Sequence, residues 1–300
     1  QLKKKTLDIT DVVFIIAPRI NAAGRIKHGN HAVELLTEFD FEQAQQFASE
    51  IEVYNAERKD LDQQITKEAL NQIEENGEQN RFTSVVFQET WHKGVIGIVA
   101  SRLIETYYRP TLVFTKSGDK YAASARSVKG FDVYNAREAC GEHLEQFGGH
   151  MYAAGMTLKP ENYTAFKEAF ERVVQETIAP EWLEPEISID AIVDFDEITP
   201  KFTRILKQFE PCGPQNMTPV FVSKNVVDTG YGKPMGKEEE HLKLFVRQNN
   251  SEGIPAIGLG LGKKYEIVKN KQLFEAAYCI DENEWNDKIE LQLRLKDIRN

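Results

Sequence analysis

The feature that most constrains the fold is a long stretch, residues 40 to about 76, that contains neither proline nor glycine. Its apolar residues recur at the spacing of a helix face: Phe47, Ile51, Tyr54, Leu61, Ile65, Ala69 and Ile73. A helix of roughly 35 residues measures about 50 Å. We expect it to end near Gly77 and to link two bodies rather than to lie inside one.

Length and composition fit a soluble protein of more than one domain. The 300 residues, 41% hydrophobic and 28% charged, suit two domains with a core each. The apolar run 12–17 is interrupted by Pro18 and is far shorter than the roughly 20 residues of a membrane span. The chain begins without Met and without an apolar signal segment, so we expect a cleaved or truncated start, no secretion and no membrane partner.

Cysteine spacing indicates the cellular compartment, and the distribution of charge indicates the class of ligand. Cys140, Cys212 and Cys279 lie far apart without a CxxC pair, which predicts reduced thiols and a cytoplasmic location. The net charge of −10 argues against indiscriminate coating of nucleic acid. Residues 92–137, however, carry eight bases and three acids, which fits either a phosphate-bearing ligand or a solvated face.

Strand and helix patterns alternate after the long helix, which predicts an α/β layer domain. Expected strands are 83–88, 111–115, 121–126 and 156–158, and expected helices are 94–107, 133–145 and 160–177. The stretch 148–155 is interpreted as a glycine-rich turn that leads into the last strand.

A second domain is predicted after a proline-containing linker at 179–185. A strand at 186–193 and a helix at 199–209 precede mostly β sequence, with runs at 219–228, 241–248, 254–258, 273–280 and 289–295. Turn chemistry at 230–236 and 283–287 separates these runs. Five or so short antiparallel strands suit a small barrel.

The first motif that could carry chemistry is Ala-Pro-Arg-Ile-Asn-Ala-Ala-Gly-Arg at 17–25, after a strand-like run. Arg19, Asn21 and Arg25 on a short turn could present forked donors to a phosphate or carboxylate. The alternative is that the arginines are surface residues at a helix start. His28 and His31 have the spacing of a ligand pair but no third ligand nearby, which disfavours a metal site.

Two further motifs lie in the α/β region. Trp-His-Lys-Gly-Val-Ile-Gly at 91–97 places His92 and Lys93 before a helix start, where backbone N–H groups favour anions, although glycine there can also serve packing. Ala-Ser-Ala-Arg-Ser at 123–127 offers donors from Ser124, Arg126 and Ser127 at a strand end. Alternation sends Ser124 and Arg126 to one face, which suits a terminal phosphate; an ion pair at the surface is the alternative.

The fourth motif, Phe-Gly-Gly-His-Met-Tyr-Ala-Ala-Gly at 147–155, places His150 after two glycines. Gly148 and Gly149 leave room for a ligand against the chain, and His150 could then donate to a phosphate or position a sugar. A buried histidine with satisfied hydrogen bonds is the alternative.

In this order the motifs, together with PCGPQNMTPVF and HLKLFV further on, resemble the C-terminal portion of RecJ-type single-stranded-DNA-specific exonucleases of the DHH phosphoesterase superfamily. The resemblance implies an α/β DHH-associated domain plus a β-barrel OB-fold, preceded by a long interdomain helix. Its parts would be the tail of the DHH catalytic domain at 1–39, the helix at 40–80, the DHH-associated domain at 81–180 and the OB-fold at 185–300.

The resemblance also implies a function, 5′→3′ exonuclease action on single-stranded DNA in repair and recombination. Ser124 and Arg126 would bind the 5′-terminal phosphate, and His150 would face the catalytic cleft. Arg19, Asn21 and Arg25 match the motif that closes the catalytic domain. In the barrel, alternation places Lys243, Phe245 and Arg247 on one face, either free to hold the trailing strand or partly core.

The metal chemistry is expected to lie outside this chain. The family uses Mn²⁺ or Mg²⁺ held by Asp and His residues of earlier motifs, and the Asp-His-His triplet does not occur here. We therefore expect a fragment that binds a 5′ end of single-stranded DNA without hydrolysing it, with a helicase and a single-strand-binding protein as partners of the longer protein. Asn286-Asp287 stands where the family often has Asn-Gly in a turn.

Two other functions remain open at this point. A non-catalytic relative could serve as a single-strand-binding scaffold in replication, but the intact SARS and GGH motifs favour the exonuclease. A phosphoesterase acting on small nucleotides or short RNA would share the α/β domain, but it would not need the extended groove of an appended barrel.

Overall fold

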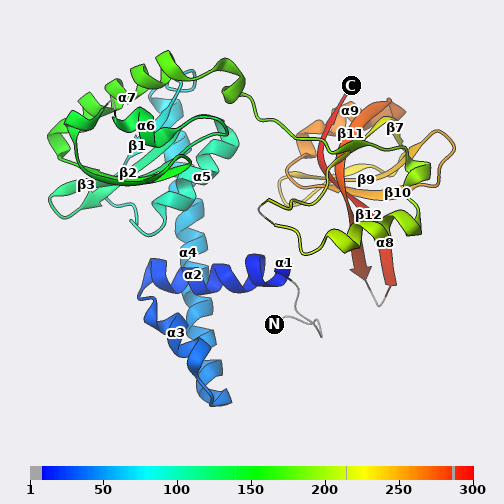
Figure 1. The fold of residues 1–300 in the computed structure, drawn as a ribbon, viewed down its shortest axis with the longest axis horizontal. Helices are drawn as coiled ribbons and strands as arrows, with labels where there is room; N and C mark the ends of the chain where they lie inside the picture. Colours follow the sequence, from blue (N-terminus) through cyan, green and yellow to red (C-terminus); the bar gives the residue numbers. More distant parts are fainter. Residues whose placement is uncertain (1–8, 139, 214, 286–287) are drawn as a thin grey trace. The chain divides into compact units, whose positions relative to one another are not determined.

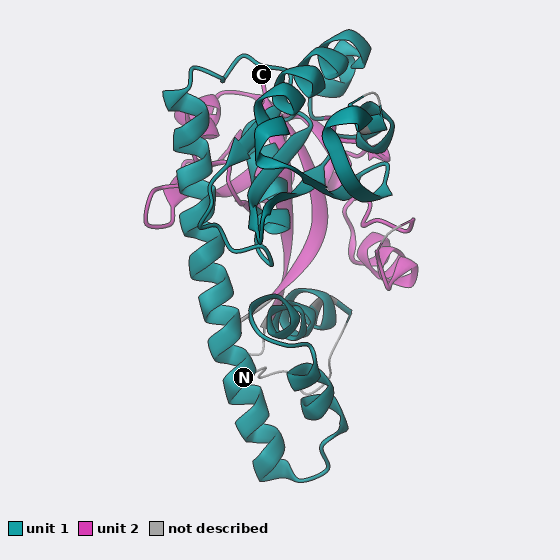
Figure 2. Cartoon of the chain, turned by 90° about the vertical axis from the view of Figure 1, so that its left-hand side faces the viewer, with its two compact units in different colours: residues 1–185 teal, residues 186–300 magenta. Residues whose placement is uncertain are grey.

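A computed structural model describes residues 9–138, 140–213, 215–285 and 288–300 of the chain. It divides into two compact units, Gln1–Pro185 and Glu186–Asn300, shown in different colours in Figure 2. None of the described helices is long and apolar enough to cross a membrane.

The expected long helix is confirmed as α4, Phe41–Glu75, which runs through the first unit (Figure 1). The Asp40 side chain accepts a hydrogen bond from the Gln43 backbone N–H at 2.8 Å and so caps its first turn. Near one end Ile51 packs with α2 and α3, and further along Ile65 and Ala69 pack with α5 and the sheet. The helix therefore joins two packing regions of the first unit.

Three short helical segments precede α4: α1 (Ile9–Asp11), which continues through a π-helical stretch at Val12–Ile16 into α2 (Ala17–Ile26), and α3 (Asn30–Thr37). The strand-like interpretation of 12–17 was wrong, and so was the turn expected at 17–25. A short apolar run fits a strand and a helix equally well. Pro18 does not break this helical run; it lies at the junction where the π-helical stretch passes into α2.

A five-stranded sheet forms the body of the first unit, in the order β1-β2-β3-β5-β4. Its strands are β1 (Ser84–Phe87), β2 (Thr111–Ser117), β3 (Lys120–Arg126), β4 (Leu144–His150) and β5 (Ala153–Leu158). β1 and β2 are parallel, joined through α5 (Ile96–Thr106), and the other neighbours are antiparallel. Helices α6 (Val133–Glu138) and α7 (Tyr163–Thr177) pack on one face, and α5 and α4 on the other.

Two sequence interpretations failed in this sheet. The helix expected at 133–145 ends at Glu138, and after a short 3₁₀ turn at Gly141–His143 the chain becomes β4. The stretch 148–155, interpreted as a turn, forms the end of β4 and the start of β5. Pairing with β5 overrides the weak strand propensity of glycine.

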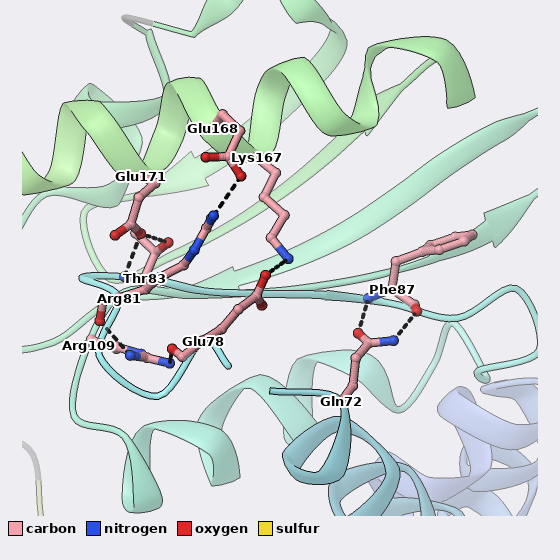
Figure 3. Close-up of polar contacts among 9 residues, drawn as sticks. All are labelled: Gln72, Glu78, Arg81, Thr83, Phe87, Arg109, Lys167, Glu168 and Glu171. Atoms are coloured by element: carbon pink, nitrogen blue, oxygen red, sulfur yellow. Dashed lines mark hydrogen bonds and ion pairs between the residues drawn. The ribbon is translucent and has the colours of Figure 1, made fainter. Parts of the chain in front are cut away.

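Polar contacts fix the end of α4 to the sheet and to α7 (Figure 3). The Gln72 side chain both donates to the Phe87 carbonyl and accepts from the Phe87 N–H, each at 3.0 Å. Glu78 pairs with Lys167 at 2.6 Å. The buried Arg109 donates to the Glu78 carbonyl at 3.0 Å and to the Ser84 hydroxyl at 2.8 Å, and also to the carbonyls of Gln79 and Arg81. These contacts hold the helix end, β1 and β2 together.

The second unit contains a seven-stranded sheet in the order β6-β7-β11-β12-β10-β9-β8, which an added β7–β9 pairing closes into a barrel. Its elements are β6 (Ala191–Ile192), α8 (Pro200–Leu206), β7 (Phe221–Asp228), β8 (Lys233–Met235), β9 (His241–Gln248), β10 (Ile254–Gly258), α9 (Tyr265–Val268), β11 (Phe274–Trp285) and β12 (Lys288–Arg299). The five longer strands trace the Greek-key path of an OB-fold.

Three details of the barrel differ from expectation. β10 and β12 are parallel, because α9 carries the chain across before β11 and β12 form, so the strands are not all antiparallel. The strand expected at 186–193 is confined to Ala191–Ile192. The turns expected at 230–236 and 283–287 contain β8 and the end of β11, respectively. Asn286-Asp287 lies outside the described residues.

Candidate nucleic-acid interface

Ser124 and Arg126 lie on the face of β3 that α5 covers, while Ala123 and Ala125 are buried against the opposite core. The Arg126 Nη1 donates to the Ser124 Oγ at 3.0 Å and to the Ala125 carbonyl at 2.7 Å. The alternation expected from the sequence is therefore present, and the Ser124 hydroxyl and the Arg126 guanidinium lie side by side. We call these two groups the β3 site.

Small residues separate this pair from His150. In the register of the sheet, Arg126 is opposite Ala153 and Ala153 is opposite His150. With about 4.8 Å between strands, the backbones of Arg126 and His150 are about 10 Å apart on the same face. One step along, Gly155 lies between Ser124 and Gly148. The stretch of sheet between the β3 site and His150, which we call the floor, therefore carries only the small residues Gly148, Ala153 and Gly155.

An open pocket begins at Gly148 and Gly155 and extends away from Arg126 along β3, β4 and β5. Lys93, Glu145, Gln146 and Thr157 are among its other lining residues, whereas Ser124, Arg126 and His150 do not line it. The expected residue His150 is exposed, so the alternative of a buried histidine is excluded, and its Nδ1 accepts from the Tyr152 N–H at 3.3 Å.

Electrostatics at Arg126 favour an anion. The side chain is half-buried, and burial together with the neighbouring Arg25 lowers its pKa. Among the residues that the structure describes, no carboxylate pairs with Arg126. A partly desolvated cation beside a second cation is costly until an anion binds. The surface ion pair considered as an alternative for Arg126 is therefore absent from the described part of the chain.

The loop before α5 is anchored to both sides of the unit. Trp91 is buried, its Nε1 donates to Glu68 on α4 at 2.8 Å, and its carbonyl accepts from the Thr115 hydroxyl at 2.6 Å. His92 uses its Nδ1 to accept from the Gly94 N–H at 3.1 Å. Lys93 remains at the rim of the pocket, where its Nζ donates to Ser117 at 3.0 Å.

The motif on α2 divides into two parts. Arg19 forms a bidentate ion pair with Glu52 on α4, at 2.5 and 2.9 Å, and so fastens α2 to the long helix. Asn21 and Arg25 are one helical turn apart on another side of α2, and both are exposed. The Arg25 guanidinium donates to the Gly94 carbonyl at 3.0 Å. Arg25 therefore lies near the β3 site, whereas Arg19 is engaged elsewhere.

Ser127 and the two glycines have different local roles. The Ser127 hydroxyl donates to the Phe131 carbonyl at 2.8 Å and closes a turn. A Cβ on Gly149 would lie 2.3 Å from the Ala153 carbonyl oxygen, so the strand pairing requires glycine there. A Cβ on Gly148 would meet nothing within 4 Å. Packing therefore does not require glycine at position 148, and the lack of a side chain there keeps the floor open.

No group of three or more His, Cys, Asp or Glu side chains in the described residues is placed to hold a metal ion. His31 approaches Glu34 and Glu50 only at 3.9 and 3.8 Å. The side chains at 9–138, 140–213, 215–285 and 288–300 therefore do not fit a divalent metal centre.

The barrel presents a second candidate surface. On β9, Lys243, Phe245 and Arg247 are exposed, whereas the alternate residues Leu242, Leu244 and Val246 are buried in the barrel core. The sequence left open whether this face is exposed or belongs partly to the core, and the structure shows that it is exposed. The Phe245 ring lies over Gly253, where a Cβ would be 2.3 Å from a ring carbon.

Sequence reasoning missed two bases on this surface. Lys233 on β8 is opposite Lys243, which is opposite Ile257, which is opposite Arg294 on β12. Lys233 falls in a segment interpreted as a turn, and the pairing of β10 with β12 cannot be read from local pattern. Nearby, buried Asp228 accepts from the Gly230 and Gly232 N–H groups and holds a loop on which Tyr231 is 78% exposed.

Comparisons with known proteins place these units in families. Residues 78–176 match the DHHA1 domain and residues 189–297 match the RecJ OB domain. The chain is similar to "Single-stranded-DNA-specific exonuclease RecJ" of Bacillus subtilis, 33% identical over 95% of this chain and 36% of the relative. To the protein of that name from Escherichia coli it is 28% identical, over 97% of this chain and 52% of the relative.

A solved structure agrees over nearly the whole chain. The crystal structure of RecJ from Thermus thermophilus in complex with Mn²⁺ superposes with a TM-score of 0.81 at 26% identity, covering 97% of this chain and 41% of that one. A second structure of the same protein, with Mg²⁺, gives 0.80. The chain spans between about a third and a half of the length of the curated relatives it matches. With a DHHA1 domain followed by a RecJ OB domain, it belongs to the RecJ family of DHH proteins and corresponds to the C-terminal portion of that family.

Proposed function

We propose that this chain holds single-stranded DNA by its 5′ end for a 5′→3′ exonuclease that acts in DNA repair and recombination. The observation that carries the proposal is the Arg126 site, a half-buried guanidinium and a hydroxyl beside a second guanidinium with no carboxylate partner in the described residues. The names of the relatives, single-stranded-DNA-specific exonucleases, give the class of ligand.

The β3 site suits a terminal phosphate. Its oxygens would accept from the Ser124 hydroxyl and the Arg126 guanidinium, with Arg25 adding positive charge from α2. The small residues of the floor leave room for the first sugar and base, and His150 stands about 10 Å from Arg126, across β5. A 5′ end with its phosphate would thus be preferred over one with a free hydroxyl.

The barrel face suits the strand that follows. Lys233, Lys243 and Arg247 would contact phosphates, and Phe245 offers a ring on which a base can stack. Such contacts read no sequence, and their affinity falls as salt rises, because each phosphate contact releases a counterion.

Hydrolysis itself is assigned to the longer protein. Divalent ions in such nucleases activate water and neutralise the charge that builds on the phosphoryl oxygens. The described residues contain no group that would hold such an ion, so this chain positions the strand, and the residues that bind Mn²⁺ or Mg²⁺ come from elsewhere in the longer protein. Action in repair would place that protein in the cytoplasm, with a helicase and a single-strand-binding protein as partners.

Fluorescence anisotropy with the 300-residue chain tests the proposal. Two labelled oligonucleotides of one sequence, with a 5′-phosphate or a 5′-hydroxyl, should differ in Kd, and Arg126→Ala should remove the difference. One charge-assisted hydrogen bond contributes about 1.5–3 kcal/mol, so the preference should be about 10- to 100-fold. Arg172→Ala is the matched control, since Arg172 is exposed on α7, which covers the opposite face of the sheet.

Two outcomes would count against the proposal. Equal affinity of the unmodified chain for both oligonucleotides would remove the terminal-phosphate site. Mn²⁺-dependent digestion of DNA by the rigorously purified chain would contradict the assignment of metal binding to other residues.

A further inference from the structure

Gly97 lies directly against the two groups of the β3 site. It is a buried residue in the first turn of α5. A Cβ built on it would lie 2.9 Å from the Ser124 Oγ and 3.0 Å from the Arg126 Nη2. The guanidinium and the hydroxyl therefore occupy the space that any other side chain at this position would fill.

Neither the backbone nor helix propensity explains a glycine here. Gly97 is not among the glycines with positive φ, so its conformation is open to every residue. Inside a helix alanine is favoured over glycine, because glycine loses more conformational freedom on folding. The glycine thus weakens α5, and the close approach of Arg126 is the feature that requires it.

Helix α5 cannot move away to make room. Val99, Ala100 and Leu103 are buried against α4 and the sheet. On the outer side, the Arg102 Nε donates at 2.7 Å to Asp62, a buried carboxylate of α4. An added methyl group would therefore be accommodated by the side chains of β3 rather than by the helix.

The atoms that would yield are those proposed to bind the phosphate. The Ser124 Oγ and the Arg126 Nη2 are ends of side chains, which can shift at little cost to the fold. Their hydrogen bonds to one anion, however, depend on their positions, since such bonds weaken steeply with poor angle and distance. A methyl group here should spare stability and harm recognition.

We propose that Gly97 is a positioning residue that sets the Ser124 hydroxyl and the Arg126 guanidinium on a single 5′-phosphate. The inference rests on the proposed function of the β3 site and adds to it a residue that touches no DNA. The lack of a side chain at Gly97 should therefore determine the preference for a phosphorylated end.

The test compares Gly97→Ala with the unmodified chain, using the phosphorylated and unphosphorylated oligonucleotides and thermal unfolding. The Kd for the phosphorylated strand should rise about tenfold, which corresponds to the loss of one charge-assisted hydrogen bond, and the Kd for the unphosphorylated strand should not change. Gly141→Ala is the control, since a Cβ on Gly141 meets no atom within 4 Å. In an Arg126→Ala background, Gly97→Ala should add no further loss.

The outcomes separate the inference from the proposed function. If Arg126→Ala abolishes the phosphate preference and Gly97→Ala keeps it, the inference is wrong and the function stands. If neither change affects the preference, the proposed site itself is wrong. If Gly97→Ala weakens both oligonucleotides equally or unfolds the chain, Gly97 has a structural role only and the inference is overturned.

Discussion

Replacing Arg109 by alanine should strongly destabilise the first unit, because its buried guanidinium serves four acceptors in β1 and in the segment between α4 and β1. It donates to the Ser84 hydroxyl at 2.8 Å and to the carbonyls of Glu78, Gln79 and Arg81 at 3.0, 2.9 and 2.5 Å. Without it, three carbonyl groups lose a partner. Figure 3 shows Arg109 with two of these residues, Glu78 and Arg81.

The magnitude follows from the number and type of these bonds. Hydrogen bonds to a charged group contribute about 1.5–3 kcal/mol each, but four bonds from one group are not additive, and burial of the charge, which lowers the pKa of Arg109, offsets part of the gain. We expect a loss of about 3–5 kcal/mol, a large fraction of the stability of a typical domain. For a unit of this size that corresponds to a fall in Tm of about 6–20 °C.

Urea denaturation followed by far-UV circular dichroism measures the loss. Arg109→Lys should recover little of it, because a single ammonium group cannot reach acceptors arranged around a planar fork. Arg172→Ala, exposed on α7, should leave the transition unchanged. A loss below about 1 kcal/mol for Arg109→Ala would refute the reasoning, since it would equal one ordinary hydrogen bond.

Three further predictions concern other contacts. Gly94→Ala would place a Cβ 2.2 Å from the carbonyl oxygen of Arg25, where only backbone movement gives room, so it should cost about 1–3 kcal/mol in urea denaturation and expose α2 to limited proteolysis. The hydrogen bond from Arg19 lowers the pKa of Glu52 below its ordinary 4.5; this stability is present above that pH and lost as pH falls below it, so Glu52→Gln should flatten the dependence of Tm on acid pH. Lys243→Ala should reduce the slope of log Kd against log salt by about 1 for every oligonucleotide sequence, and an unchanged slope would remove Lys243 from the phosphate-contacting face.

Local pattern predicted the elements whose signal lies within one segment. The long helix was recognisable because residues 40–76 contain no helix breaker and repeat their apolar positions at one spacing. The alternation of Ser124 and Arg126 was likewise a property of one strand. Features that depend on partners distant in sequence were not predictable, such as the glycine-containing end of β4, which is a strand only because β5 pairs with it.

The candidate sites show the same division. The motif residues were found by their chemistry, but their neighbours come from the register and from packing between elements. Lys233 and Arg294 join Lys243 only through strand pairing, and Gly97 meets Arg126 only because α5 packs on β3. Arg19 carries a guanidinium suited to binding an anion, and only the structure shows that this guanidinium is paired with the Glu52 carboxylate.

The unbroken helix α4 sets both the distance and the rotation between two parts of the first unit. Ile51, which packs against α2 and α3, and Ile65, which packs against α5, are about 21 Å apart along the axis. An insertion of one residue between them would turn one contact face by about 100° relative to the other. About seven inserted residues would nearly restore the angle but lengthen the helix by about 10 Å, enough to carry Arg25 out of reach of the loop at Gly94. The contacts near Ile51 and near Ile65 therefore fix both the length of helix between them and the rotation of one contact face relative to the other.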